Sequence, residues 1–151
     1  LTDNLSVLEP SAGDGLIIDQ IHQNYTFQNL DIDCVELNKE KAQACSAKGY
    51  NTFHTDFLEF KTDKKYDRII AAPPFKGNVD IIHIQKMYDL LKSKGILVSL
   101  TSPYWLTNNE NHQVQFRKWL EGKKYWLTMA PDNSFIEKSK TVPTAIIKFF
   151  K

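Results

Sequence analysis

Cysteine is scarce in this chain of 151 residues, which contains only Cys34 and Cys45. Their spacing fits neither a metal site nor a disulfide framework, so we interpret both as buried thiols of a reducing compartment. Long apolar runs are also missing. None approaches the ~18 residues of a membrane-spanning helix, and no signal peptide is recognisable. These absences argue against a disulfide-rich secreted domain and against a membrane partner, and they predict a cytoplasmic protein.

An excess of charge of one sign is absent as well, because 19 Lys and Arg residues face 18 Asp and Glu residues for a formal net charge of +1. The chain as a whole therefore carries no basic field that would indicate a nucleic-acid partner. His22, His54, His83 and His112 have no spacing typical of a metal site or a catalytic triad, so we predict no metal. A hydrophobic content of 42% suits one domain over residues 1–151.

Short apolar runs alternate with helical patterns along the chain. Their alternation favours right-handed crossovers and an α/β fold with a mostly parallel sheet and helices on both faces. Strands are expected at Ser6–Glu9, Asp31–Glu36, Asn51–His54, Tyr66–Ala71, Ile96–Leu100, Tyr125–Met129 and Thr144–Phe150. Helices are expected at Leu16–Gln23, Lys39–Cys45, Ile81–Leu91 and Gln113–Leu120.

A glycine turn containing Gly13 and Gly15 follows the first expected strand. In an open parallel sheet such a turn lies at the ligand-binding edge, and its glycines permit a close backbone approach. The third glycine of a dinucleotide fingerprint is missing, since Leu16 follows Gly15 directly. Glu36 ends the second strand about twenty residues further on, where a ribose diol would lie. The pattern favours a nucleoside-type cofactor without a pyrophosphate. S-adenosylmethionine is therefore expected rather than NAD.

A second loop follows the fourth expected strand and reads Ala72-Pro73-Pro74-Phe75. Together the glycine turn and this loop resemble the signature loops of class I S-adenosylmethionine-dependent methyltransferases that modify exocyclic amino groups, in particular bacterial and phage adenine-N6 DNA methyltransferases. The resemblance implies a Rossmann-like fold with a seven-stranded sheet and an antiparallel strand near the carboxyl end. In that family the loop begins with Asn or Asp, whereas this chain has Ala72.

The resemblance also implies which residues bind the cofactor. Asp56, after the third strand, corresponds to the acidic side chain that accepts a hydrogen bond from the adenine amino group, and Phe57 would lie against the adenine ring. The cofactor-binding set that the resemblance predicts is Glu9, Pro10, Ser11, Ala12, Gly13, Gly15, Glu36, Leu37, Asp56 and Phe57.

For the reaction, the resemblance implies that the carbonyl of Pro73 accepts a hydrogen bond from the target amino group and that Phe75 stacks on a flipped base. Ala72 has no acceptor for the second hydrogen bond, so we expect little or no turnover from this chain. An enzyme that has lost its catalytic amide and a non-catalytic cofactor-binding or scaffold subunit both remain compatible with Ala72. Loss of one preorganised contact of this kind costs ~2.7–4 kcal/mol.

The expected substrate is nucleic acid, DNA rather than RNA, in a bacterial or phage-infected cell. Phe135 to Thr144 resembles the hairpin with which the DNA enzymes bring another aromatic residue to the target base, although Lys140 replaces its usual glycine. Lys76 and Tyr104 complete the predicted substrate-binding residues with Phe75 and Phe135. An RNA base methyltransferase and a protein glutamine methyltransferase share the Pro-Pro-aromatic loop and are the alternatives.

Two parts of such enzymes have no counterpart in this sequence. The family has a helix before the first strand that helps to enclose the methionine end of the cofactor, and a target recognition domain after the last strand. We therefore expect these parts to lie elsewhere in a longer protein, or recognition to come from a partner subunit.

Overall fold

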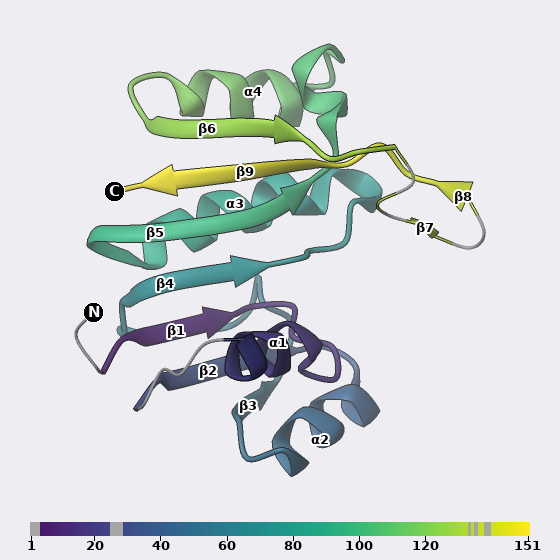
Figure 1. Cartoon of the computed structure of the whole chain (residues 1–151). Coiled ribbons are helices and arrows are strands. Elements are labelled where there is room, and N and C mark those ends of the chain that lie inside the picture. Colours follow the sequence, from purple (N-terminus) through teal and green to yellow (C-terminus); the bar gives the residue numbers. More distant parts are fainter. Residues whose placement is uncertain (1–3, 25–28, 133, 135, 138–139) are drawn as a thin grey trace.

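A computed structural model describes residues 4–24, 29–132, 134, 136–137 and 140–151. One sheet of seven strands forms the centre, in the order β3-β2-β1-β4-β5-β9-β6 (Figure 1). The strands are β1 Ser6–Glu9, β2 Asp31–Glu36, β3 Asn51–His54, β4 Tyr66–Ala71, β5 Leu91–Thr101, β6 Lys124–Met129 and β9 Ala145–Phe150. The helices are α1 Leu16–Asn24, α2 Lys39–Ala47, α3 Val79–Leu90 and α4 Asn111–Leu120, with short 3-10 helices at Lys76–Asn78 and Pro103–Leu106.

The strand order reverses at β1, which has β2 on one side and β4 on the other, both parallel to it. β3 and β5 extend the parallel part of the sheet, and β9 then pairs antiparallel with both β5 and β6. The predicted mostly parallel sheet with an antiparallel strand near the carboxyl end is therefore confirmed. The reversal at β1 opens a crevice beyond the carboxyl ends of β1 and β4, which is where such sheets bind ligands.

The largest difference from the sequence-based boundaries is at the end of α3 and the start of β5. α3 ends at Leu90, and β5 already begins at Leu91 instead of after Gly95. Leu91 pairs with Tyr66, after which the register shifts until Arg68 pairs with Ile96. The intervening backbone folds so closely that a Cβ on Gly95 would lie 2.8 Å from the carbonyl oxygen of Lys92. The apolar periodicity of α3 runs on into Leu91 because that side chain is buried in the same core.

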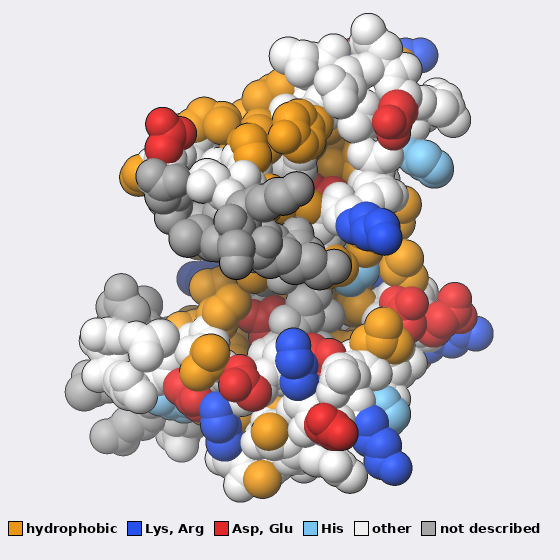
Figure 2. Space-filling model, turned by 90° about the vertical axis from the view of Figure 1, so that its right-hand side faces the viewer, with side chains coloured by type: hydrophobic (Ala, Val, Ile, Leu, Met, Phe, Trp, Pro, Cys, Tyr) orange, Lys and Arg blue, Asp and Glu red, His pale blue; other side chains and the backbone are white. Residues whose placement is uncertain are grey.

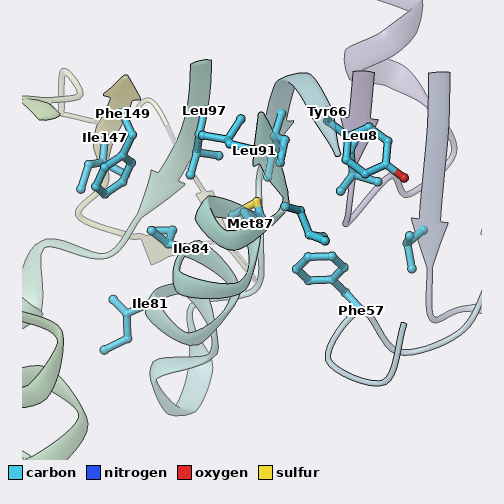
Figure 3. Packing of buried hydrophobic residues seen from close by; sticks show 14 of the residues in the cluster. Leu8, Phe57, Tyr66, Ile81, Ile84, Met87, Leu91, Leu97, Ile147 and Phe149 are labelled. Carbon is cyan, nitrogen blue, oxygen red and sulfur yellow. The ribbon is translucent and has the colours of Figure 1, made fainter. Parts of the chain in front are cut away.

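Two hydrophobic clusters cover the two faces of the sheet. On one face, Leu97, Ile147 and Phe149 pack against Ile84 and Met87 of α3 (Figure 3). The smaller cluster lies under α1 and comprises Val7, Ala12, Ile18, Ile32, Cys34 and Cys45. Both cysteines are free and buried, as predicted. Because β1 is parallel to both of its neighbours, β2 and β4, the loops after these three strands meet at one edge of the sheet (Figure 1).

A short two-stranded hairpin precedes β9. β7, Ile136–Glu137, pairs antiparallel with β8, Lys140–Thr141. This agrees with the hairpin predicted between Phe135 and Thr144, although Phe135 itself lies outside the described residues. Within the part of the chain that the structure describes, no helix is both long enough and apolar enough to cross a membrane.

Candidate cofactor and acceptor site

A cavity of about 610 Å³ lies at the carboxyl ends of β1, β2 and β4. Figure 2 looks onto this side of the molecule, where acidic, basic and hydrophobic side chains surround a central hollow. The cavity is lined by Pro10, Ser11, Gly13, Glu36, Leu37, Lys41, Asp56, Phe57, Leu58, Ala72, Pro73, Pro74, Phe75, Lys76, Val79 and His83. The fold therefore brings most of the sequence-predicted residues of the two signature loops together in the lining of this one cavity.

The glycine turn after β1 needs glycine for its backbone conformation, because Gly13 and Gly15 both have positive φ, 57° and 88°. No atom lies within 4 Å of the position that a Cβ of Gly13 would take, so this residue presents open backbone at the cavity. Gly15 instead packs inward, where a Cβ would lie 3.2 Å from the ring of Tyr50. Gly15 does not line the cavity, and the close approach it permits is to Tyr50.

Glu36 fixes the turn from the end of the neighbouring strand. Its Oε2 accepts a hydrogen bond from the backbone N–H of Gly13 at 2.7 Å, and its Oε1 accepts one from the N–H of Asn38 at 2.7 Å. Asn38 in turn caps α2 by accepting from the N–H of Lys41. The carboxylate is thus held at the cavity wall with lone pairs left over for hydroxyl donors. Next to it, Leu37 is 66% exposed and supplies an apolar side chain to the cavity.

The loop after β3 forms a second wall. Asp56 Oδ1 accepts from the N–H of Leu58 at 2.8 Å, which closes a tight turn. Lys86 of α3 holds this loop from the other side, because its Nζ donates to the carbonyls of Phe57, Leu58 and Phe60 at 2.6, 2.8 and 2.7 Å. Partial burial lowers the pKa of Lys86. These contacts could not be predicted from the sequence, since Lys86 lies in an amphipathic helix far along the chain.

His83 is a further cavity residue, although the sequence analysis favoured no site role for it. It is 6% exposed and lies edge-on to Phe57, with 5.1 Å between the ring centroids. Burial lowers the pKa of its imidazole to about 4, even though Asp56 acts in the opposite direction, so the ring is neutral at physiological pH. Its Nδ1 is buried and has no hydrogen-bond partner among the described residues. Only its burial on an apolar helix face was visible in the sequence.

The loop after β4 brings Ala72, Pro73, Pro74 and Phe75 to the cavity. Pro73 is buried and Phe75 half-buried, so the loop is anchored at its first proline while the aromatic ring remains at the surface of the site. Ala72 contributes a methyl group where an amide would project. Phe75 also lines a second, smaller cavity of about 220 Å³, and it therefore separates two adjoining hollows.

Tyr104 lines this smaller cavity and not the larger one. The turn after β5 points its 51%-exposed ring outward and buries Trp105, whose Nε1 donates to Thr101 at 3.1 Å. The carboxylate of Asp80 accepts from Thr101 Oγ1 and the N–H of Ser102, both at 2.8 Å. The smaller cavity is thus lined by fixed polar groups beside Phe75.

Two predicted cofactor residues lie behind the cavity wall. Glu9 is fully buried at the end of β1, and its Oε1 accepts from the N–H of Ser11 at 3.1 Å while Oε2 has no partner among the described residues. Burial raises the pKa of Glu9 from 4.5 to about 8, and the negative charge of Glu36 adds to this. Ala12 is buried too, with its N–H bonded to the carbonyl of Val35 at 3.0 Å. Across the described residues, no group of three or more His, Cys, Asp or Glu side chains is placed to hold a metal ion.

No protein-family model matches the chain. The fold is nevertheless the Rossmann-like fold of class I methyltransferases. A type I restriction-modification methyltransferase subunit from Streptococcus thermophilus superposes with a TM-score of 0.82 at 19% identity, covering 99% of this chain and 40% of that one. A protein from Listeria monocytogenes, assigned as a class I S-adenosylmethionine-dependent methyltransferase, gives 0.80 at 14% identity over 99% of this chain and 54% of its own.

A curated relative shows similarity in sequence as well. The tRNA1(Val) (adenine(37)-N6)-methyltransferase of Cytophaga hutchinsonii is 35% identical over 85 residues, an alignment that covers 49% of this chain and 34% of that protein. The chain thus matches about a third of this relative's length, and it spans 40% of the Streptococcus subunit.

Proposed function

We propose that this chain is the S-adenosylmethionine-binding domain of a methyltransferase directed at the exocyclic amino group of adenine in nucleic acid. The observation that carries the proposal is the single cavity into which Gly13, Glu36, Asp56 and the Pro73–Phe75 loop all converge. Its volume of about 610 Å³ lies in the range of small-molecule and cofactor sites. The fold shared with class I methyltransferases supports the same cofactor.

The cofactor half of the cavity is matched to a nucleoside. The carboxylate of Glu36, fixed by two backbone N–H groups, accepts hydrogen bonds from the ribose hydroxyls. Asp56 accepts from the adenine amino group with the oxygen that the turn leaves unused, and the neutral ring of His83 lies beside it. Glu36 and Asp56 place two carboxylates in the cavity lining, which also includes Lys41 and Lys76.

The acceptor half contains the Pro73 carbonyl and the Phe75 ring. S-adenosylmethionine, when bound, supplies an electrophilic methyl group on a sulfonium. The Pro73 carbonyl would accept a hydrogen bond from the target amino group and orient the nitrogen lone pair toward the methyl donor, while Phe75 would stack on the base. The proton that the target nitrogen loses would pass to solvent. Ala72 offers no second acceptor, which limits the rate.

The nucleic acid substrate has support from two directions. The hairpin of β7 and β8 ahead of β9 resembles that of DNA adenine methyltransferases, and the Streptococcus protein of similar fold is a restriction-modification subunit. The relative with 35% identity is a tRNA methyltransferase. We favour DNA because of this hairpin, and RNA is the competing substrate of the same chemistry. A non-catalytic cofactor-binding subunit is the second candidate function, and Ala72 is the observation in its favour.

The cofactor assignment predicts that Glu36→Ala and Asp56→Ala each weaken S-adenosylmethionine binding by about tenfold or more, because each removes a hydrogen bond to a charged group, worth ~1.5–3 kcal/mol. Isothermal titration calorimetry with S-adenosylmethionine measures the change. Glu40→Ala is the matched control, since Glu40 is an exposed glutamate on α2 outside the cavity.

Circular dichroism of each variant separates lost binding from lost structure, which matters for Glu36 because its carboxylate also bonds to Gly13 and Asn38. If folded Glu36→Ala and Asp56→Ala proteins bind the cofactor as tightly as the Glu40→Ala control, the cofactor assignment is wrong.

A further inference from the structure

The smaller cavity beside Phe75 lies outside the proposed cofactor site. Among the described residues, only Phe75 lines both this cavity and the larger one. The smaller cavity has a volume of about 220 Å³, below the range of about 300–1,000 Å³ that is usual for drug-sized ligands and cofactors. It therefore suits one small ring system on the far side of Phe75 and not a second complete cofactor.

Aromatic side chains and open backbone make up part of this lining. The ring of Tyr104 is 51% exposed, and Phe75 is half-buried. Gly77 has a positive φ of 70°, and no atom lies within 4 Å of the position that its Cβ would take, so a ligand has room to approach this backbone. Any nucleobase can stack on an aromatic side chain, because every base has a π-face.

Hydrogen bonds connect three polar side chains of the lining in a closed ring. Gln113 Nε2 donates to Asn78 Oδ1 at 2.9 Å, and Asn78 Nδ2 donates to Glu110 Oε2 at 2.7 Å. The N–H of Glu110 donates to Gln113 Oε1 at 3.3 Å, which closes the ring. Each amide nitrogen carries a second N–H, and the carboxylate has further lone pairs, so these side chains can also bond to a ligand. Asn, Gln and Glu are side chains that read the edges of bases.

The loop that carries Tyr104 is fixed by an arginine of α4. The Nη1 of Arg117 donates to the carbonyls of Trp105 and Asn108, and its Nη2 donates to Asn109 Oδ1 at 2.9 Å. Gln113, which joins the ring of hydrogen bonds from the same helix, is only 4% exposed. The walls of the cavity are thus held in place without a ligand, which lowers the entropic cost of binding one.

The charges of the lining select against phosphate. Asp80 and Glu110 are negative, and none of the described residues that line the cavity is Lys, Arg or His. Asp80 is already bonded to Thr101 and Ser102, whereas Glu110 is exposed. A carboxylate accepts from the exocyclic amine of cytosine, and thymine presents a carbonyl oxygen at the same position, which a carboxylate repels. The occupant that fits is a base that carries an amine.

We propose that the smaller cavity is a subsite for the nucleobase next to the target base, and that it selects cytosine over thymine or uracil. Phe75 then lies between two consecutive bases, with the target base on the side of the cofactor. Tyr104 stacks on the neighbouring base, and Glu110 accepts a hydrogen bond from its amine. This inference rests on the proposed function, because it needs the target base in the larger cavity.

The test measures binding of single-stranded oligonucleotides of about nine nucleotides to the full-length protein by fluorescence anisotropy at one fixed salt concentration. Each oligonucleotide is a run of thymidines with one central adenine, and cytosine replaces thymine on its 5′ side, on its 3′ side or on neither. Uridine versions test RNA. We expect cytosine on one of the two sides to tighten binding by about tenfold. Selection in either backbone supports the subsite, and the backbone that binds tighter identifies the substrate.

Two variants locate the selection in the cavity. Glu110→Gln keeps the size of the side chain and removes its charge, so it should remove most of the preference for cytosine. Tyr104→Ala should weaken binding of the cytosine oligonucleotide by about tenfold through lost stacking. The matched controls, Glu121→Gln and Tyr125→Ala, change exposed residues outside both cavities and should have neither effect.

The outcomes separate this proposal from the proposed function. If every flanking base gives equal binding while Phe75→Ala still weakens it, the subsite is wrong and the target-base site stands. A preference for cytosine that persists in both Glu110→Gln and Tyr104→Ala, with folding verified by circular dichroism, would place the selection elsewhere and also overturn the subsite. No binding of any oligonucleotide would overturn the subsite together with the nucleic-acid substrate.

Discussion

Replacing Ala72 by Asn is expected to raise methyl transfer by about a hundredfold to a thousandfold, because it restores a preorganised acceptor for the target amino group, worth ~2.7–4 kcal/mol. The side chain at position 72 already lines the cavity beside Pro73 and Phe75, so an amide placed there reaches the same space. The gain should appear in kcat and leave the affinity for S-adenosylmethionine unchanged, since the acceptor contacts the target nitrogen. Tritium transfer from labelled cofactor to DNA, and in parallel to RNA, measures it in the full-length protein.

Ala72→Leu is the matched control, because leucine has nearly the size of asparagine but no hydrogen-bond acceptor. It should give no increase. Transfer to RNA alone by the Ala72→Asn protein would keep the mechanism and change the substrate. No transfer to either nucleic acid would favour the non-catalytic subunit.

A second large effect is expected at Glu9, whose substitution by Gln should stabilise the protein by on the order of 3 kcal/mol at pH 7. The pKa of this buried carboxyl rises from 4.5 to about 8 on folding. Between these values the folded protein keeps a proton that the unfolded chain has released, so stability falls as pH rises. Glutamine keeps the shape and the bond from the N–H of Ser11 but cannot ionise.

Urea unfolding checks this expectation at about pH 5, near the ordinary pKa of the carboxyl, and at about pH 7.5, near its pKa of about 8 in the folded protein. The Glu9→Gln and unmodified proteins should be close in stability at the lower pH and diverge at the higher one. Glu40→Gln, at an exposed glutamate on α2, should show no such divergence. If the two proteins keep a constant difference at both pH values, the ionisation of Glu9 does not govern the stability.

The order of strands and helices could be predicted from the sequence because each element carries a strong local pattern. The alternation in Asp31–Glu36 and the apolar run in Ile96–Leu100 define strands whatever their neighbours are. That Glu36 and Asp56 line one cavity was predictable for a related reason. Glu36 ends β2 and Asp56 comes shortly after β3, and the carboxyl ends of parallel strands meet at one edge of the sheet. The roles of these two side chains in binding the cofactor stay a prediction.

Other parts of the site depend on contacts between distant segments and were not predictable. Lys86 lies on α3 and holds the loop of Phe57 to Phe60. This loop lies 26 to 29 residues earlier in the chain. In sequence it is one more lysine on an amphipathic helix. Tyr104 was expected at the acceptor site because it follows β5, but the 3-10 turn at Pro103–Leu106 directs it to the smaller cavity. The local sequence pattern does not determine the direction in which the Tyr104 side chain points.

The position of β9 has a consequence for how the protein is made. β9 comes after β6 in the sequence, yet it lies between β5 and β6 and is the strand through which β6 joins the sheet. While the chain is being synthesised, the free edge of β5 and the whole of β6 therefore wait unpaired until residues 145–150 have left the ribosome. Such exposed strand edges favour aggregation, so this is the interval in which the nascent protein most needs a chaperone.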